Sequence, residues 1–361
     1  MLALVIRQYQ WKICSMTAPS EPEHRRSRRA AKQASMADVA LRAGVSTITV
    51  SRALRRPDQV TESTRQQIQA AMAELGYVPN LIAGGLATTQ TRIVSVIVPY
   101  IAHGVFADAI QGVADALENR GYCVLLGNSA GSVNHEEQIV RILLGHRPAG
   151  VVIQGANHTE ATRRLLRNAS IPVVEIGTLP KAPIDMAVGY SNFEAARAMT
   201  HYLIERGHRR IGFVSATPTE NDRAAERLSG YRAALTEAGL EYDRALVLYT
   251  TFGIREGRAA LMTLLALKDK PDAIFCASDL WAAGMISECA RRRIAVPAEL
   301  AIAGFNDQEI ASEIVPAITT IRVPRYDIGR ISGELIISRI EGGKADTTVD
   351  LGFELVRRDS A

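Results

Sequence analysis

Three side chains between residues 47 and 52 have types and a spacing suited to contacting nucleic-acid bases. Thr47, Ile48 and Arg52 share the outer face of a predicted helix that begins after the N-cap Ser46. An arginine can hydrogen-bond to guanine in the major groove, and an apolar side chain can touch a thymine methyl group. The pattern therefore indicates a DNA-reading helix, although an ordinary helical hairpin would show the same turn signals.

Neighbouring segments must hold that face in place. Residues 35–56 predict a helix, a turn at Gly44 and a second helix, with Ser35 and Asp38 spaced as a capping box. A third helix is expected between Thr61 and Gly76. The residues expected to face inward are Val39, Ala40, Ala43, Val45, Val50, Leu54, Ile68, Ala71, Met72 and Leu75.

Charge is concentrated in the same part of the chain. Residues 1–87 contain 12 Lys and Arg against 6 Asp and Glu, whereas the whole chain of 361 residues has a net charge of only +4. The remaining residues are thus slightly acidic. A basic segment next to a predicted base-reading helix is what phosphate binding requires, although a charged run is also typical of an ordinary solvated surface.

Residues 36–87 resemble the DNA-binding head and hinge of the LacI/GalR family of bacterial repressors. The matching motifs are Asp38-Val39-Ala40, Ala43-Gly44-Val45-Ser46, Thr49-Val50-Ser51-Arg52 and Gly76-Tyr77-Val78-Pro79-Asn80. The resemblance implies a homodimer on a near-palindromic double-stranded operator. It assigns Thr47, Ile48, Ser51 and Arg52 to the major groove, and the hinge residues Asn80, Ala83 and Leu86 to the minor groove.

The rest of the chain alternates between strand and helix patterns, which predicts two parallel sheets covered by helices. Strands are expected at 93–98, 122–126, 150–153, 173–176, 186–188, 211–214, 245–248, 273–276, 300–305, 319–323 and 353–356, and helices at 106–120, 136–144, 160–167, 193–206, 223–238, 255–267, 281–292 and 327–340. The strand at 186–188 is expected to close the first half. The expected fold is an all-α helix-turn-helix head plus an α/β core of two doubly wound lobes, and the resemblance implies that the core is periplasmic-binding-protein-like.

Four segments follow from these patterns. They are a basic, disordered extension (1–34), a helix-turn-helix domain (35–78), a hinge (79–91) and a two-lobed effector-binding and dimerisation domain (92–361). Residues 17–34 have two open interpretations. They are a disordered basic arm that adds phosphate contacts, or the start codon is mis-assigned and Met16 or a later position is the true start of translation.

The family resemblance also implies an effector site between the lobes. Arg227 matches an arginine that binds effectors, and a guanidinium can hold a carboxylate through two hydrogen bonds. Phe106 and Phe252 are expected to pack on the ligand from the two lobes. Asp279 could bind hydroxyls or cap a helix. Asn306 stands where many sugar-binding members have Asp, which favours an anionic effector.

The motifs at 185–197, 206–209 and 350–353 most resemble repressors of gluconate utilisation, so the expected effector is a sugar acid such as gluconate. A neutral sugar or another metabolite is the alternative. Arg227 as a plain surface residue and Phe106 as plain core are also open.

Other classes of protein fit less well. No carboxylate pair or Ser/His/Asp arrangement indicates catalysis, and the cysteines and the scattered histidines after residue 100 lack metal-ligand spacing, so no enzyme activity, metal or cofactor is expected. These histidines, His103, His135, His146, His158, His201 and His208, are expected to be solvated or to cap helices. No apolar run is long enough to span a membrane, and no signal peptide is evident, which indicates a cytoplasmic protein rather than a secreted solute-binding protein. Salt-dependent duplex binding by residues 1–90 would separate these classes.

Overall fold

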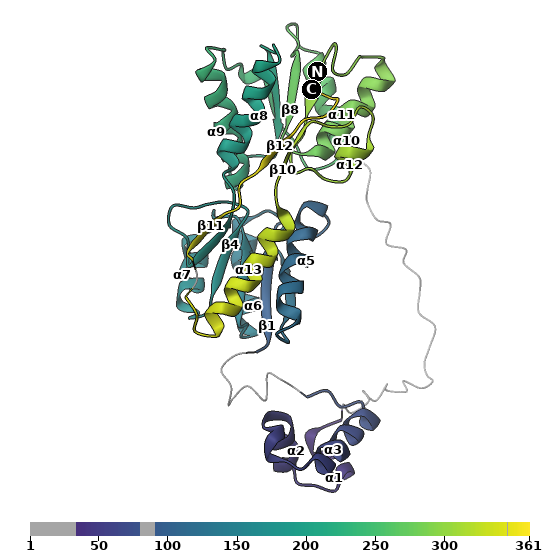
Figure 1. Cartoon of the computed structure of the whole chain (residues 1–361), viewed down its shortest axis with the longest axis vertical. Helices are drawn as coiled ribbons and strands as arrows, with labels where there is room; N and C mark the ends of the chain where they lie inside the picture. The colour runs from purple at the N-terminus through teal and green to yellow at the C-terminus, as the bar shows by residue number, and fades with distance from the viewer. Residues whose placement is uncertain (1–33, 80–90, 345) are drawn as a thin grey trace, which may run out of the picture. The chain divides into compact units, whose positions relative to one another are not determined.

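The computed structural model describes residues 34–79, 91–344 and 346–361. These residues form a small helical unit and a larger α/β unit, which are described separately (Figure 1). The predicted hinge residues Asn80, Ala83 and Leu86 and nearly all of the predicted extension lie outside the described residues.

The helical unit begins and ends its helices as the capping pattern predicts. It contains α1 (Met36–Ala43), α2 (Thr47–Arg55), the short 3-10 helix η1 (Pro57–Gln59) and α3 (Glu62–Leu75). The Ser35 hydroxyl accepts from the Asp38 N–H while the Asp38 carboxylate accepts from the Ser35 N–H, which completes the capping box. The αL backbone of Gly44, at φ 66°, ends α1 and lets α2 turn away.

A small core joins these three α-helices. Val39, Val50 and Ile68 are fully buried, as expected from their spacing. One expectation is wrong: Leu54 is 38% exposed, and its neighbour Ala53 is buried instead. Ala53 lies three residues after Val50, so α2 turns that face inward, and the small alanine side chain lets α2 lie close to its neighbours.

The first lobe of the α/β unit has one six-stranded parallel sheet in the order β11-β5-β4-β3-β1-β2. Its strands are β1 (Ile93–Val98), β2 (Cys123–Asn128), β3 (Gly150–Gln154), β4 (Val173–Ile176), β5 (Met186–Gly189) and β11 (Thr348–Asp350), and its helices are α5 (Gly104–Glu118), α6 (Val133–Gly145), α7 (Glu160–Asn168) and α13 (Arg325–Ile340). Most of β1, β3, β4 and β5 is buried, which explains their continuous apolar runs.

The edge of this sheet differs from the expectation. β5 does not close the first half, because β11 pairs with it in parallel, with Val349 opposite Val188. The sequence did not indicate β11 because three residues carry no hydrophobic pattern, and the strand forms only where β5 offers free backbone groups.

The second lobe has a four-stranded parallel sheet in the order β7-β6-β8-β9 and a two-stranded antiparallel pair, β10 with β12. Its elements are α8 (Asn192–Glu205), β6 (Ile211–Ser215), α9 (Asp222–Glu237), η2 (Arg244–Leu246), β7 (Val247–Tyr249), α10 (Ile254–Leu265), β8 (Ala273–Cys276), α11 (Asp279–Arg292), β9 (Ala301–Ala303), α12 (Ile310–Glu313), β10 (Thr320–Arg322) and β12 (Glu354–Val356). The strand expected at 245–248 is half 3-10 helix, because the Asp243 side chain caps η2.

The chain passes between the two lobes three times. It crosses after β5, again between β10 and α13, and finally between β11 and β12. The yellow C-terminal segment in Figure 1 makes the last of these crossings. These three short segments are therefore the inter-lobe hinge about which the two lobes can move relative to each other. Within the described residues, no helix is long and apolar enough to cross a membrane.

Candidate functional site

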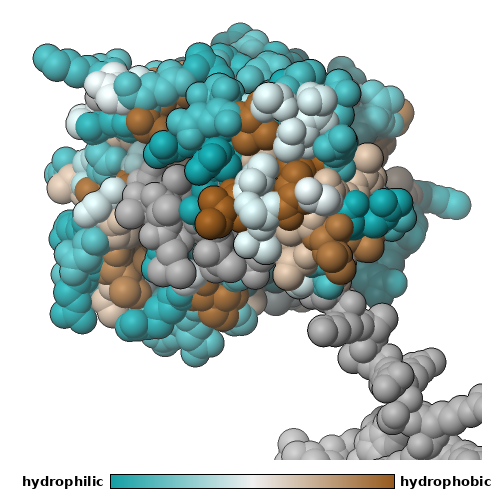
Figure 2. All heavy atoms as spheres, turned by 90° about the horizontal axis from the view of Figure 1, so that it is seen from below, coloured by the Kyte–Doolittle hydropathy of each residue, from teal (hydrophilic) through white to brown (hydrophobic). Residues whose placement is uncertain are grey.

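The outer face of α2 carries the predicted base-reading residues. Ile48 is 67% exposed, and Thr47 and Arg52 are also exposed, while Ser51 is half-buried. None of the ion pairs among the described residues involves Arg52, so its guanidinium is available for a base or a phosphate. Figure 2, a view from below, shows apolar side chains interspersed among hydrophilic ones on the surface of the protein. An exposed isoleucine at the start of a helix-turn-helix second helix suits an apolar base contact.

The larger unit holds a cavity of about 650 Å³ between its two lobes. It opens where strands of both sheets end: Pro99 and Tyr100 follow β1, Gln154 ends β3, and Ser215 ends β6. Ligands bind at the carboxyl ends of parallel strands in doubly wound sheets, because loops from several strands converge there. The cavity is large enough for a six-carbon ligand with its first hydration shell.

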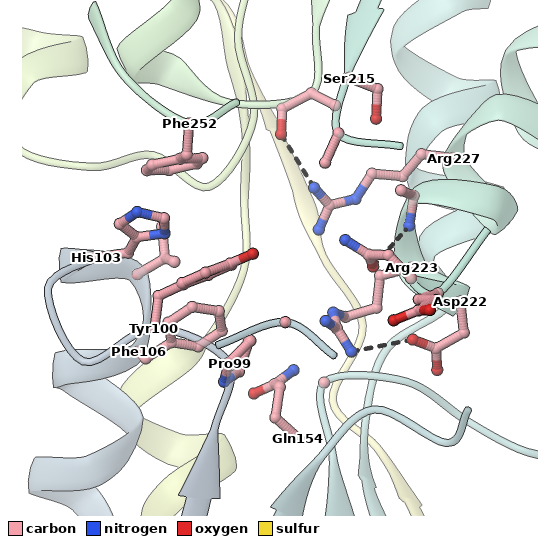
Figure 3. Close-up of a pocket in the computed structure, with 18 of the residues that line it drawn as sticks. Pro99, Tyr100, His103, Phe106, Gln154, Ser215, Asp222, Arg223, Arg227 and Phe252 are labelled. Carbon is pink, nitrogen blue, oxygen red and sulfur yellow. Dashed lines mark hydrogen bonds and ion pairs between the residues drawn. The ribbon is translucent and has the colours of Figure 1, made fainter. Parts of the chain in front are cut away.

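Two walls of different chemistry face each other across this cavity (Figure 3). Tyr100, His103, Phe106 and Phe252 form an aromatic side, with the His103 and Phe252 rings stacked at 4.1 Å between centroids. Arg223, Arg227 and Asp222 from α9 form the opposite, polar side. An aromatic face packs on the C–H groups of a sugar, while charged groups bind its polar substituents.

Arg227 is held firmly at the polar wall. Its Nε donates to Asn192 Oδ1 at 2.9 Å, one terminal nitrogen donates to the Ala277 carbonyl at 3.0 Å, and the other donates to the Tyr190 hydroxyl at 3.1 Å. Its guanidinium also lies 3.7 Å above the centre of the Phe305 ring. Burial lowers the pKa of Arg227 below its usual range, yet an arginine with so high a starting pKa stays charged.

The side chain of Asn192 is itself fixed. Asn192 is fully buried at the start of α8, and its amide nitrogen donates to the Gly177 carbonyl at 2.9 Å. That bond turns the amide oxygen toward Arg227. Asn192 and Tyr190 were not predicted as site residues. The sequence does contain a signal for them: both residues follow the apolar strand β5 directly, at the point where the chain passes from the first lobe to the second.

The other charged groups of the polar wall are paired. Arg223 contacts Asp222 at 3.0 Å, and the second Asp222 oxygen accepts from the Ala156 N–H of the other lobe at 2.7 Å. Arg325 contacts Asp108 at 2.8 Å. Arg223 was also missed, although it lies four residues before Arg227 and therefore on the same face of α9.

Four of the five predicted effector-site residues line this cavity. Phe106, Arg227, Phe252 and Asn306 are brought together by loops and helices of both lobes. Asn306 is nearly buried at φ 102°, and its carbonyl accepts from Arg325.

Asp279 does not line the cavity, and the geometry corrects both roles considered for it. Its side chain is fully buried, with one oxygen accepting from the Thr320 hydroxyl at 2.6 Å and the other from the Gln308 N–H at 2.8 Å. The N-cap of α11 is Ser278. Burial raises the pKa of Asp279 to about 7. Both carboxylate oxygens are therefore used to join α11 to the loop after β9 and to β10.

Two histidines also depart from the expectation of solvated or capping roles. His103 lines the cavity without capping α5 through its side chain, and burial lowers its pKa. His158 is buried between two carboxylates. Among the described residues, no group of three or more His, Cys, Asp or Glu is arranged to hold a metal ion.

Comparison with known proteins agrees with both halves of this architecture. Residues 35–80 match the model for bacterial regulatory proteins of the lacI family, and residues 200–361 match a periplasmic binding protein-like domain. The HTH-type transcriptional regulator GntR of Pseudomonas aeruginosa is 36% identical over 326 residues, which cover 90% of this chain and 94% of the relative. The chain belongs to the LacI family of bacterial transcriptional regulators.

Other relatives match the chain across both its helical unit and its α/β unit. The HTH-type transcriptional repressor CytR of Escherichia coli is 35% identical over 86% of this chain and 90% of its own length. A LacI-family regulator from Silicibacter pomeroyi superposes with a TM-score of 0.86 at 32% identity, covering 91% of this chain and 99% of that chain. The lac repressor dimer bound to operator superposes with a TM-score of 0.77 at 25% identity, and the match covers 91% of this chain and 99% of the repressor chain. A LacI-family chain of this kind is a DNA-binding transcriptional regulator.

Proposed function

We propose that this regulator is a repressor whose binding to operator DNA is controlled by a sugar acid, with gluconate as the first candidate. The observation that carries this proposal is the charge of Arg227. Six cavity-lining residues carry full charges, namely Glu136, Glu220, Asp222, Arg223, Arg227 and Arg325. Among the three arginines, only Arg227 forms no ion pair with any described carboxylate. A half-buried cation that lines a cavity without a carboxylate partner favours an anionic ligand.

The donor count of Arg227 supports a carboxylate as that anion. A guanidinium has five N–H groups, and three of those of Arg227 are engaged by Asn192, Ala277 and Tyr190. Two N–H groups remain, one on each terminal nitrogen, which is the set that a carboxylate accepts from with its two oxygens. Asn306 adds a neutral amide to the lining, so it does not repel an anion.

A neutral sugar is the second candidate. The regulator CelR has a solved structure in complex with cellobiose, and it is 32% identical to this chain in a match that covers 91% of this chain and 100% of the CelR chain. The aromatic wall formed by Tyr100, His103, Phe106 and Phe252 would pack on a neutral sugar as well as on an acid. The charge of Arg227 is the feature that favours the acid.

On the DNA side, we propose a homodimer that places one α2 helix in each half of a near-palindromic operator. Arg52 and Thr47 would read base edges, Ile48 would touch a thymine methyl group, and Ser51 would contact the backbone or a base. Asn80, Ala83 and Leu86 of the predicted hinge are proposed to contact the minor groove between the half-sites. Such a protein works in the bacterial cytoplasm, where its operator is located.

Control by the effector follows from the position of the cavity. Since both lobes line it, a ligand that contacts both binds one arrangement of the lobes better than another. That preference is sufficient to change the affinity for operator, and by reciprocity operator changes the affinity for the effector.

Calorimetry on the full chain tests the proposal with gluconate, 6-phosphogluconate, ribose, cellobiose and a purine nucleoside. Gluconate is expected to bind, and Arg227→Ala to abolish binding. Arg227→Lys keeps the charge but loses the paired donors, so it should weaken gluconate binding by about tenfold or more. Binding of only neutral compounds, or full gluconate affinity in Arg227→Ala, would contradict the sugar acid. Gel-shift titration with and without the effector then tests the control of DNA binding.

A further inference from the structure

A buried cluster of titratable groups lies beside the cavity in the first lobe. His158 Nδ1 is 2.6 Å from Glu136 Oε1, and His158 Nε2 is 3.5 Å from Glu175 Oε1. The side chains of His158 and Glu175 are fully buried, and that of Glu136 is 8% exposed. Glu136, in the first turn of α6, is the member of the cluster that lines the cavity.

The hydrogen-bond pattern determines where the proton lies. His158 Nε2 faces the Gly155 carbonyl at 3.1 Å, and a carbonyl only accepts, so Nε2 carries a hydrogen. His158 Nδ1 lies 2.6 Å from Glu136 Oε1, and it donates to that oxygen when the ring carries its second proton. Burial lowers the pKa of His158, but hydrogen bonds to Glu136 and Glu175 outweigh it and raise the pKa to about 9.

The cluster therefore places a protonated His158 ring between the carboxyl groups of Glu136 and Glu175. Glu175 Oε2 accepts from the Ile184 N–H. Only the Oε1 atom of Glu136 contacts His158. No described group donates to Glu136 Oε2, which leaves that oxygen as a free acceptor at the cavity.

A second carboxylate adds to the negative charge at this end. Glu220, in the loop between β6 and α9, lines the cavity and accepts from the Val133 N–H at the start of α6 at 3.4 Å. Arg223 and Arg325 are neutralised by their own partners. The cavity thus has a positive group, Arg227, on the second lobe and negative groups around the first turn of α6.

We infer that Glu136, held by His158, makes the cavity specific for a polyhydroxy acid with one carboxylate and excludes the corresponding diacid. This inference rests on the proposed function, since it assumes that Arg227 binds a carboxylate. With that group on Arg227, the hydroxyl end of the ligand donates to Glu136 Oε2. A second carboxylate at that end cannot donate, and it would face Glu136 at close range, where like charges repel strongly.

Gluconate and glucarate test this inference directly. Glucarate has the same six-carbon chain and hydroxyl groups, but its terminal CH2OH is a carboxylate. Calorimetry at pH 7 on the full chain should show gluconate binding about tenfold or more tightly than glucarate. Glu136→Gln removes the charge at nearly constant volume, so it should reduce this preference to about threefold or less.

Glu137→Gln is the matched control. Glu137 is the next residue of α6, but it does not line the cavity, and its oxygens accept from Arg141 and Thr159, both at 2.8 Å. This variant should keep the preference of the wild type. Glu136→Asp keeps the charge, and it provides a second test if thermal unfolding shows that Glu136→Gln does not fold. It should retain the discrimination against glucarate while binding gluconate more weakly.

The outcomes separate the inference from the proposed function. Equal binding of gluconate and glucarate by the wild type, or an unchanged preference in folded Glu136→Gln, overturns the role of Glu136 and leaves the sugar-acid site intact. Absence of gluconate binding in the wild type overturns the proposed function instead, and with it the inference.

Discussion

His103 of the first lobe stacks on Phe252 of the second lobe, with ring centroids 4.1 Å apart and ring planes inclined by 26°. The Trp281 and Phe252 rings pack edge to face with their centroids 5.5 Å apart, and the Tyr100 and His103 ring centroids are 4.6 Å apart. Burial lowers the pKa of His103, which keeps its ring neutral near pH 7. Because His103 and Phe252 both line the cavity, their stacking joins the two lobes at the place where a ligand would be enclosed.

Loss of the Phe252 ring should therefore affect ligand binding more than folding. Aromatic pairs contribute about 0.5–1.5 kcal/mol beyond their buried area, so Phe252→Ala should weaken effector binding by about threefold to tenfold. Phe252→Tyr keeps the ring and should bind as the wild type does. Calorimetry with gluconate measures the change, and equal affinities in all three proteins would show that the stacked pair does not take part in binding.

Replacement of Arg52 should reduce binding to operator more than binding to random duplex. Its exposed guanidinium on α2 is free of ion pairs with described residues, so Arg52→Ala should cost about 1–3 kcal/mol on operator and less on random DNA. Arg65 on α3, which pairs with Glu62, offers a control of the same charge. Equal losses on both DNAs in a salt-matched gel-shift titration would mean that Arg52 contacts only phosphate.

Gly230 lets α9 lie close against α8. A Cβ atom at this position would lie 2.1 Å from the Phe193 carbonyl oxygen and 3.0 Å from the Arg197 nitrogen. Backbone atoms cannot move aside without shifting a helix, so Gly230→Ala should destabilise the fold by about 1–3 kcal/mol. It should also weaken gluconate binding, because α9 carries Arg227 and α8 carries its partner Asn192.

The adjacent Ser229 is exposed on the same helix, so Ser229→Ala should stay within about 0.5 kcal/mol of the wild type. Urea unfolding provides both values. A Gly230→Ala protein as stable as the wild type would show that the two helices can separate at little cost.

Stability should fall at alkaline pH because of His158. Its pKa is raised from 6.5 to about 9 in the folded chain, so the folded state holds a proton that the unfolded state releases. This contribution is fully present below pH 6.5 and is lost as the pH rises through about 9. Between these limits the free energy of unfolding should fall by about 1–3 kcal/mol more than in His158→Asn. Parallel pH slopes of the two proteins in urea titrations would refute the charged imidazole.

Much of the helical unit was determined by the sequence itself. Ser35 and Asp38 cap each other across three residues, and Ser46 and Thr61 cap the next helices through contacts of the same span. Such partners meet whenever the chain turns into a helix, so the residue types alone identify them. The strand at 93–98 was equally clear, because a continuous apolar run is what a strand buried on both faces requires.

The cavity depended on contacts between distant parts of the chain. Asp279 looked like a ligand residue at the end of a strand, but the fold brings it to Thr320, 41 residues away, and uses up its carboxylate. Glu136 and His158 are 22 residues apart and meet only because α6 packs beside the loop after β3. Whether a polar side chain reaches the cavity or another buried group is decided by the packing of helices on the sheets. Local sequence does not encode that packing, because the partners have no fixed spacing along the chain.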